Sequence, residues 1–312
     1  MAVLTELYST TRANREMPLA DNVTNHNAFL YILENKGHIK NANGGRDLTE
    51  PLLYGEYSNA KWYDGYETFT VDTSEEVVTA AVYDWKQLGG FAFISGKEEH
   101  MNVGKHAAVD LVTAKDEGLM ATLRNKAAIA LYNDGVTDPK AWGGLQLLVA
   151  DAPATGVVGG IDRATDAWWR NQTSGDITMD AANIQGEMND MYLATIRGQD
   201  QTDLILADLV AYKAYWESLQ VIQRITSVEM GEAGFHALEF MKAPVVYDTA
   251  CPANHMYFLN TDFLRMRKAP GRWFTDETPQ AIQSADYTLF PNWTMSNLTM
   301  NNAARQGVIW SS

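Results

Sequence analysis

The chain has 312 residues, of which 46% are hydrophobic and 20% are charged, a balance typical of a globular protein with a sizeable core. With 24 basic against 39 acidic side chains, its formal charge is −15, and no cluster of Lys and Arg stands out, which argues against a nucleic-acid groove as the main function. The single cysteine, Cys251, excludes an internal disulfide and is expected to be a small buried residue. Neither a signal-peptide pattern nor an apolar run near ~18 residues is present, so neither export nor a membrane span is expected.

Residues 1–42 are predicted to form an N-terminal arm. They are rich in Asn, Thr and Ala, and their main apolar piece, residues 28–33, suits either a short helix or a strand. Its flanks carry too little apolar surface to order themselves alone. We therefore expect an arm that is ordered by lying on something else, with a disordered tail as the alternative.

Residues 43–78 are predicted to form an extended hairpin loop. After Asn43-Gly44-Gly45, residues 46–57 and 66–78 resemble two strands on either side of a tip at residues 58–65. Arms of this length would extend roughly 40 Å at ~3.3 Å per residue, and an isolated two-stranded ribbon is marginal in water. The aromatic and polar tip is therefore expected to rest on another molecule, unless the hairpin folds back on its own domain. The candidate interface residues are Tyr57, Asn59, Lys61, Trp62, Tyr63, Asp64 and Tyr66.

Residues 98–133 keep one helical period from end to end and are predicted to form a long spine helix. The apolar stripe runs through Leu111, Leu123 and Leu131, and it includes Gly104 and Gly118, which are expected to let a sheet lie close. Residues 78–85 and 90–95 alternate as strands do and are the candidates for that sheet. An ordinary core helix in an enzyme is the alternative.

Residues 142–275 are predicted to form a compact mixed domain, and residues 276–312 to return to the sheet beside the spine helix. Strands are expected at residues 145–149, 204–207, 238–241, 245–247 and 256–260, with helices beginning at Thr178 and Asp208. In the tail, where Arg305 is the only charged residue after Asp286, strands are expected at residues 287–290, 293–300 and 308–310.

Motifs for catalysis, metals or nucleotides are missing from the sequence. The six histidines have no metal-ligand spacing, and the glycines of residues 156–160 lack the phosphate-loop ending. No nucleophile elbow is found, and Cys251 is expected to be buried rather than reactive. We therefore predict a protein that is not an enzyme, with no catalytic, cofactor-binding or metal-binding residues and no cofactor.

An arm, an extended loop, a helical spine on a sheet and a mixed domain, in that order, resemble the major capsid (coat) proteins of tailed bacteriophages with the Hong Kong 97-type fold. Five phrases, in order and across nearly the whole chain, strengthen the likeness: GGRDLTEPLLYGEYSNAKWYDGYETFTV, VYDWKQLGGFAFISGKE, GGLQLLVADAPATGVVGGIDRATDAWWRNQ, DLILADLVAYKAYWESLQVIQRIT and CPANHMYFLNTDFL.

The resemblance implies an α+β coat fold with an N-terminal arm (1–42), an extended loop over a neighbour (43–78), a peripheral domain with the spine helix (79–141), an axial domain (142–275) and a returning segment (276–312). It implies a structural subunit of an icosahedral phage head, the virion capsid, assembled in the host cytoplasm from hexamers and pentamers of one chain. Because the arm is short, a separate scaffolding protein is implied, together with a portal, and a decoration protein is compatible with this arrangement.

Packaged double-stranded DNA would be contacted only weakly, since a shell of acidic subunits does not hold the polymer. Some members of the family link a loop lysine to an asparagine, and Lys61 lies at the tip, but no partner residue can be matched. Two other functions remain open: an encapsulin-like compartment shell that binds cargo enzymes, and a soluble α+β enzyme.

Overall fold

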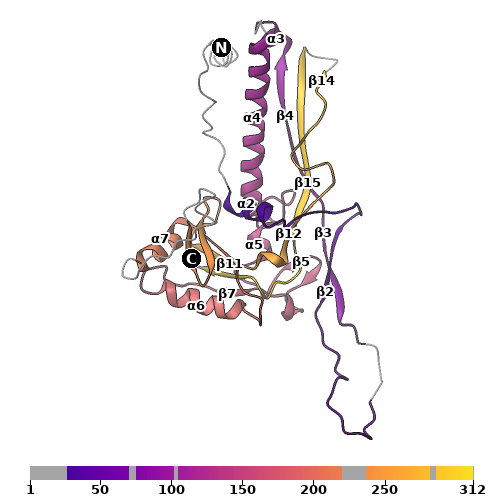
Figure 1. Cartoon of the computed structure of the whole chain (residues 1–312), viewed down its shortest axis with the longest axis vertical. Coiled ribbons are helices and arrows are strands. Elements are labelled where there is room, and N and C mark those ends of the chain that lie inside the picture. The colour runs from indigo at the N-terminus through magenta and orange to yellow at the C-terminus, as the bar shows by residue number, and fades with distance from the viewer. Residues whose placement is uncertain (1–26, 70–74, 102–104, 220–236, 282–285, 312) are drawn as a thin grey trace.

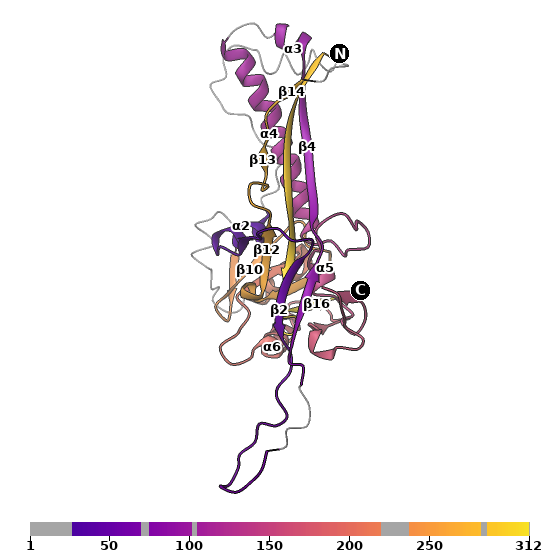
Figure 2. The ribbon, with the colours of Figure 1, turned by 90° about the vertical axis from the view of Figure 1, so that its right-hand side faces the viewer.

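The computed structural model describes residues 27–69, 75–101, 105–219, 237–281 and 286–311. Figures 1 and 2 show an elongated molecule in which a long helix and a tall sheet rise from one side of a mixed body, while a loop projects from the opposite side. The long helix is α4 (Lys105–Ala130), and α3 (Gly96–Met101) precedes it. The predicted α+β class is confirmed, with a long helix on a sheet that is antiparallel except for its edge strand of residues 39–41.

The tall sheet is organised around β15. This strand pairs antiparallel with β4 from Tyr287 to Ser296 and with β12 from Ser296 to Met300, so it runs from the far end of the sheet into the body. The prediction that the tail returns to the sheet beside the spine helix is therefore confirmed. The six strands are β1 (Ile39–Asn41), β4 (Lys86–Ser95), β12 (Leu264–Lys268), β13 (Thr275–Asp276), β14 (Gln280–Ala281) and β15 (Tyr287–Met300).

Two adjacent glycines in β4 explain how closely its neighbours approach. A Cβ on Gly90 would lie 2.9 Å from Leu119 of α4, and a Cβ on Gly89 would lie 2.0 Å from the Trp293 ring on the paired strand β15. The close approach of helix and sheet therefore depends on glycine in the strand. The prediction that Gly118 provides it is wrong, because Gly118 is exposed and a Cβ there would meet nothing within 4 Å.

The spine helix is shorter at its end than predicted. Hydrogen bonds from Tyr132 to the carbonyl of Ile129 and from Asn133 to that of Ala130 tighten the last turn, so α4 ends at Ala130. Leu123, Ala127 and Leu131 are buried on the predicted stripe. Residues 102–104, with Gly104, and the side chains of residues 105–111, with Leu111, lie outside what the structure describes.

The body is built on a second six-stranded sheet, in the order β7-β16-β11-β8-β10-β9. Its central strands are fully buried, with one apolar core on each face. The predicted strands at 204–207, 238–241, 245–247, 256–260 and 308–310 are confirmed, and Cys251 is buried as predicted. The strands are β7 (Gln172–Ser174), β8 (Leu204–Ala207), β9 (Ala237–Phe240), β10 (Ala243–Tyr247), β11 (His255–Leu259) and β16 (Gly307–Trp310).

Helices cover this second sheet. Asp208 caps α7 (Leu209–Ser218) as predicted, by accepting the amide of Ala211 at 2.8 Å. Helix α6 (Ile184–Thr195) begins later than predicted, because Thr178 precedes a turn closed by Asp180 and does not cap the helix. Helix α2 (Ala28–Asn35) resolves the ambiguity at residues 28–33, and it is ordered by packing Phe29 and Leu33 into the core of its own chain.

Residues 145–149 are not a strand. They form the short helix α5 (Leu145–Leu148), because an apolar run of this length has no period that separates the two structures. Gly144 permits this turn, since a Cβ there would lie 2.1 Å from the amide nitrogen of Asn133. The buried Arg163 donates hydrogen bonds to the carbonyls of Leu147 and Leu148 at the end of α5.

A separate two-stranded ribbon carries the projecting loop. It consists of β2 (Leu48–Leu53) and β3 (Val78–Tyr83), paired antiparallel from Leu48 opposite Tyr83 to Leu53 opposite Val78. The first predicted arm therefore contains a strand, but its partner starts at residue 78. The prediction of a strand beginning at residue 66 is wrong for residues 66–69, which have no strand structure, and residues 70–74 lie outside the described part. The small hairpin of β5 (Val157–Val158) and β6 (Ile161–Asp162) packs beside β3, where Val82 donates to the carbonyl of Gly159.

Candidate assembly interface

The projecting part of the extended loop, residues 54–77, continues from the β2–β3 ribbon, which forms its base. Within β2 the side chains alternate between the core and the solvent, and Glu50 takes a core position between Leu48 and Leu52. Its side chain is only 2% exposed, so its charge must be neutralised by nearby groups. Figure 2 shows the β2–β3 ribbon beside the body with the loop continuing away from it.

Two strands of the tall sheet supply the partners of Glu50. Arg267 of β12 donates from Nε to Oε1 at 2.5 Å and from a terminal nitrogen to Oε2 at 2.8 Å, a bidentate pair. Thr299 of β15 donates to Oε1 at 3.0 Å, and Arg265 lies 3.8 Å from Oε2. Hydrogen bonding to Glu50 raises the pKa of Arg267, so the guanidinium stays charged. This cluster fixes the inner side of the ribbon to the sheet.

A chain of aromatic contacts fixes the other side of the loop base. Tyr54 stacks on Trp168 with ring centroids 5.0 Å apart, and Trp168 in turn contacts Trp169. Trp169 is buried and donates to the carbonyl of Val158, while Arg163 donates to the carbonyl of Trp169 itself. The two tryptophans lie in the 3-10 helix η1 (Ala167–Trp169). The Trp168–Trp169 pair therefore serves as a packing platform for the loop.

Beyond this base the predicted interface residues are exposed. Trp62 and Tyr66 are as exposed as in an isolated peptide, at 101% and 104%, while Tyr57 and Tyr63 are 58% and 64% exposed. Large aromatic side chains are seldom left so open in a soluble monomer. Asn59, Lys61 and Asp64 are exposed beside them. The structure thus brings all seven predicted residues onto one projecting tip.

Contacts inside the loop give the tip a shape. Lys61 pairs with Glu67 at 3.1 Å and lies 5.6 Å from the centre of the Phe69 ring, which also meets Tyr63 edge to face. Nearer the base, the carboxylate of Glu75 accepts hydrogen bonds from the hydroxyl and the amide of Ser58, and these bonds lower the pKa of Glu75. These contacts join side chains around the tip to one another and leave Trp62 and Tyr66 uncovered.

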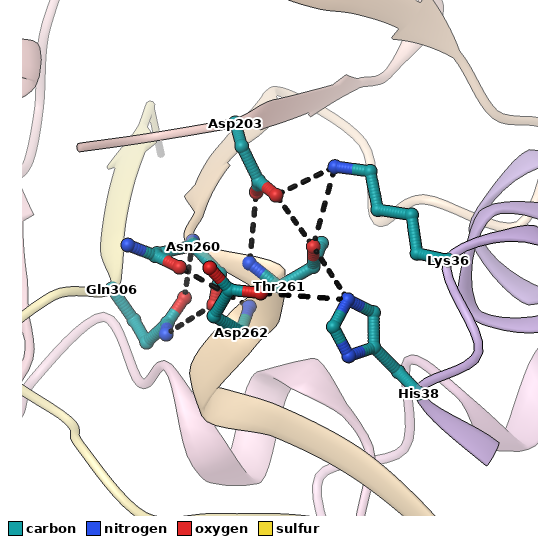
Figure 3. Close-up of polar contacts among 7 residues, drawn as sticks. All are labelled: Lys36, His38, Asp203, Asn260, Thr261, Asp262 and Gln306. Carbon is teal, nitrogen blue, oxygen red and sulfur yellow. Dashed lines mark hydrogen bonds and ion pairs between the residues drawn. The ribbon is translucent and has the colours of Figure 1, made fainter. Parts of the chain in front are cut away.

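A second polar cluster joins the segment after α2 to the body (Figure 3). Asp203 accepts from Lys36 at 2.6 Å and from the Thr261 hydroxyl at 2.5 Å, and His38 lies 3.3 Å from that hydroxyl. Burial lowers the pKa of His38, against the attraction of Asp262. Because Thr261 is fully buried, its hydroxyl has no access to a substrate. The cluster therefore has a structural role, because it holds the segment after α2 against the body.

Within the described ranges, no group of three or more His, Cys, Asp or Glu side chains is placed to hold a metal ion. No helix among those residues is long and apolar enough to cross a membrane.

Sequence reasoning missed the buried charges of Glu50 and Arg163 and the partly buried Asp203, which hold these parts together. Only Glu50 left a signal, as a charged residue at an inward position of an alternating strand. The partners of Asp203 come from segments 167 and 58 residues away, and no local pattern shows such pairing.

The architecture defines the class of fold: a long helix on an antiparallel sheet, a mixed body and a projecting loop, which together form the Hong Kong 97-type capsid fold. Solved structures agree along nearly the whole chain. The chain is similar to the capsid subunit of cyanophage A-1(L), at 18% identity and a TM-score of 0.72, over 96% of this chain and 97% of that one. It is also similar to a chain in a solved structure of Mycobacterium phage Bobi, at 12% identity and a TM-score of 0.61, over 96% of this chain and 94% of that one.

An encapsulin complex from Synechococcus elongatus has the same fold, at 8% identity and a TM-score of 0.61, over 98% of this chain and 94% of that one. No protein-family model and no curated protein matches the sequence.

Proposed function

We propose that this chain is a structural subunit of the icosahedral head of a tailed phage, without enzymatic activity, that assembles into hexamers and pentamers around packaged double-stranded DNA. The observation that carries the proposal is the likeness to capsid subunits over 96% of the chain, at a TM-score of 0.72. The exposed aromatic tip supports it, because exposed apolar patches mark surfaces that bind another molecule.

In this proposal the boundaries follow the fold. The extended loop (43–78) covers a neighbour, residues 79–141 form the peripheral domain, residues 142–275 the axial domain, and residues 276–312 return to the sheet. Residues 1–42 form the N-terminal arm, of which the structure describes residues 27–42. Tyr57, Asn59, Lys61, Trp62, Tyr63, Asp64 and Tyr66 are the contact residues of the loop.

The partners follow from the same proposal. The shell is assembled in the host cytoplasm with a separate scaffolding protein and a portal, and the virion leaves room for a decoration protein. With a charge of −15 per subunit, the wall contacts DNA weakly, which lets the polymer move during packaging.

The test is to purify the full chain, separate it by sedimentation and image the fast fraction by electron microscopy. Closed shells are expected, and a chain that stays monomeric at high concentration would contradict the proposal. A variant lacking residues 59–65 should give a folded, soluble subunit that forms no closed shells. A matched variant in which residues 59–65 become Gly and Ser keeps the loop length, so it separates the chemistry of the tip from its reach.

An encapsulin-like compartment is the second candidate, because the encapsulin complex matches over 98% of this chain. The contents of the particles distinguish the two functions. Shells isolated from the native source that hold double-stranded DNA favour the phage head, and shells that hold a co-purifying enzyme favour the compartment.

A further inference from the structure

The link between β1 and β2 contains the only Asn-Gly pair in the sequence, Asn43-Gly44. This link, residues 42–47, joins the tall sheet to the β2–β3 ribbon that carries the extended loop. Both of its ends are fixed. At the first, the amide of Ala42 donates to the carbonyl of Lys268 at 2.9 Å, and directly after the link, Leu48 is buried as the first residue of β2.

The side chain of Asn43 is open to water, and the residue after it can rotate freely. Asn43 is exposed, and its side chain makes no hydrogen bond to any residue that the structure describes. Gly44 has a φ of +79°, and a Cβ at this position would meet nothing within 4 Å. Glycine has more backbone freedom than any other residue. The backbone nitrogen of Gly44 can therefore move toward the side chain of Asn43 without a steric clash.

Two hydrogen bonds within the described part of the chain hold residues 43–45. The amide of Gly44 donates to the carbonyl of Ala42 at 2.9 Å, and Nε1 of Trp85 donates to the carbonyl of Gly45 at 3.1 Å. The first bond closes a turn of only three residues, as in a γ-turn. Neither bond belongs to a helix or to a pair of strands, so a local motion that breaks them leaves both sheets intact.

An asparagine that precedes a mobile glycine can form a ring with the backbone. The nitrogen of Gly44 attacks Cγ of Asn43, the bond from Cγ to Nδ2 breaks, and the proton of the attacking nitrogen leaves with Nδ2 as ammonia. Water then opens the resulting succinimide. Addition at Cγ gives aspartate, and addition at the backbone carbonyl gives isoaspartate. Nothing is oxidised or reduced, and water is the only co-reactant.

We infer that Asn43 is a site of spontaneous covalent modification, at which the folded chain converts asparagine through a succinimide into aspartate and isoaspartate. The inference does not depend on the proposed function. Each conversion adds one negative charge, which takes the formal charge from −15 to −16. Isoaspartate also routes the main chain through Cγ and lengthens the link by one atom. Because both ends of the link are fixed, this change falls between the tall sheet and the ribbon that carries the extended loop.

Peptide mapping by mass spectrometry tests this site in the full-length chain, kept folded in a mildly alkaline buffer. Trypsin releases residues 41–46, which contain Asn41 and Asn43, and residues 47–61, which contain Asn59. All three asparagines are exposed, and Asn41 and Asn59 are each followed by alanine, so they are matched internal controls. Conversion of the amide to a carboxylate raises the mass of the peptide by about 1 Da. A sample digested before incubation gives the starting value.

We expect Asn43 to convert at least about tenfold faster than Asn41 or Asn59, a difference of ~1.4 kcal/mol in the barrier, because no Cβ hinders the attacking nitrogen. Conversion no faster than at the two controls would overturn the inference. The same chain unfolded in urea shows what the fold contributes. The folded chain should convert at a rate within about tenfold of the unfolded one. A slower rate would mean that the fold keeps the Gly44 nitrogen away from Cγ, which would also overturn the inference.

Hydroxylamine gives a second readout that is specific for the succinimide, because it attacks the ring and cuts the chain there. The folded native chain should be cut between residues 43 and 44. Asn43→Gln should not be cut, since its longer side chain would have to close a six-membered ring. Asn59→Gln is the matched control and should be cut like the native chain. An uncut native chain, or equal cutting of Asn43→Gln, would contradict the modification. Both substituted residues are exposed, so neither variant changes the core.

Discussion

Glu50 of β2 and Arg267 of β12 are 217 residues apart in the chain and form a bidentate ion pair in the structure, with the Glu50 side chain 2% exposed. The pair joins the base of the extended loop to the tall sheet. Together with the stacking of Tyr54 on Trp168, this pair holds the base of the loop to the rest of the chain.

Replacing the buried Glu50 by Gln should destabilise the chain by about 2 to 4 kcal/mol, because it leaves the partly buried Arg267 without its counter-charge. Urea unfolding followed by circular dichroism measures this loss. Glu56→Gln, at an exposed position of the loop, is the matched control and should change the free energy of unfolding by less than about 0.5 kcal/mol. Equal effects at the two positions would contradict the role of the cluster.

Substituting Arg163 should destabilise the chain as much as substituting Glu50, for a different reason. It is 1% exposed and donates to the carbonyls of Leu147, Leu148 and Trp169, so no carboxylate shares its site. Burial lowers its pKa to about 10, which still leaves it charged at neutral pH. Arg163→Met removes all these donors and should cost about 2 to 4 kcal/mol.

The control for Arg163 is Arg46→Met, at a side chain that is 95% exposed. Thermal unfolding of the two variants gives the comparison. A melting temperature for Arg163→Met that equals the control would mean that water replaces the lost donors.

Alanine substitutions at two glycines should change the stability of the chain in opposite directions. Gly118 lies in α4 with nothing near a new Cβ, so Gly118→Ala should stabilise the chain by about 0.5 to 1 kcal/mol through helix propensity. Gly89→Ala places a methyl group 2.0 Å from the Trp293 ring and should destabilise it by about 1 to 3 kcal/mol. Denaturant midpoints decide the signs, and a destabilising Gly118→Ala would refute the exposed position of this residue.

His255 makes stability depend on pH. Burial lowers its pKa, but hydrogen bonds outweigh that effect and raise it above 6.5: Nε2 lies 3.1 Å from Asp151, and Nδ1 lies 2.6 Å from the carbonyl of Ala253. Two acceptors favour the doubly protonated ring. A raised pKa contributes stability that is complete below pH 6.5 and is lost as the pH rises through the folded value.

Urea unfolding between about pH 6 and 8.5 tests this dependence. The difference in free energy of unfolding between the native chain and His255→Gln should be largest at the acidic end and shrink toward the basic end. His100→Gln, at an exposed histidine, should track the native chain. A difference in free energy of unfolding that grows with pH would contradict the raised pKa of His255.

The sequence predicted the elements with strong local periods. The strand of residues 204–207, the cap at Asp208 and the stripe of Leu123, Ala127 and Leu131 are each visible within a short window, because the period or the cap chemistry is local. The seven tip residues could likewise be predicted as an exposed cluster, because they lie within one short stretch of the sequence.

What the sequence did not predict depends on distant partners. Residues 145–148 became a helix because Gly144 approaches Asn133 and Arg163 supplies donors at the far end. The strand pairing of the loop starts at residue 78, since β3 gains contacts from the β5–β6 hairpin that no alternation in the loop reveals.

The strand β15 has a mechanical consequence. At Ser296 it pairs with both β4 and β12, so one unbroken backbone belongs to the tall sheet and to the body. Such a strand acts as a lever arm: tilting its far end by a few degrees must rotate the base with it. In a closed particle, where fivefold and sixfold surroundings demand unequal curvature, that difference in tilt would fall on the projecting loop, which extends beyond this stiff frame.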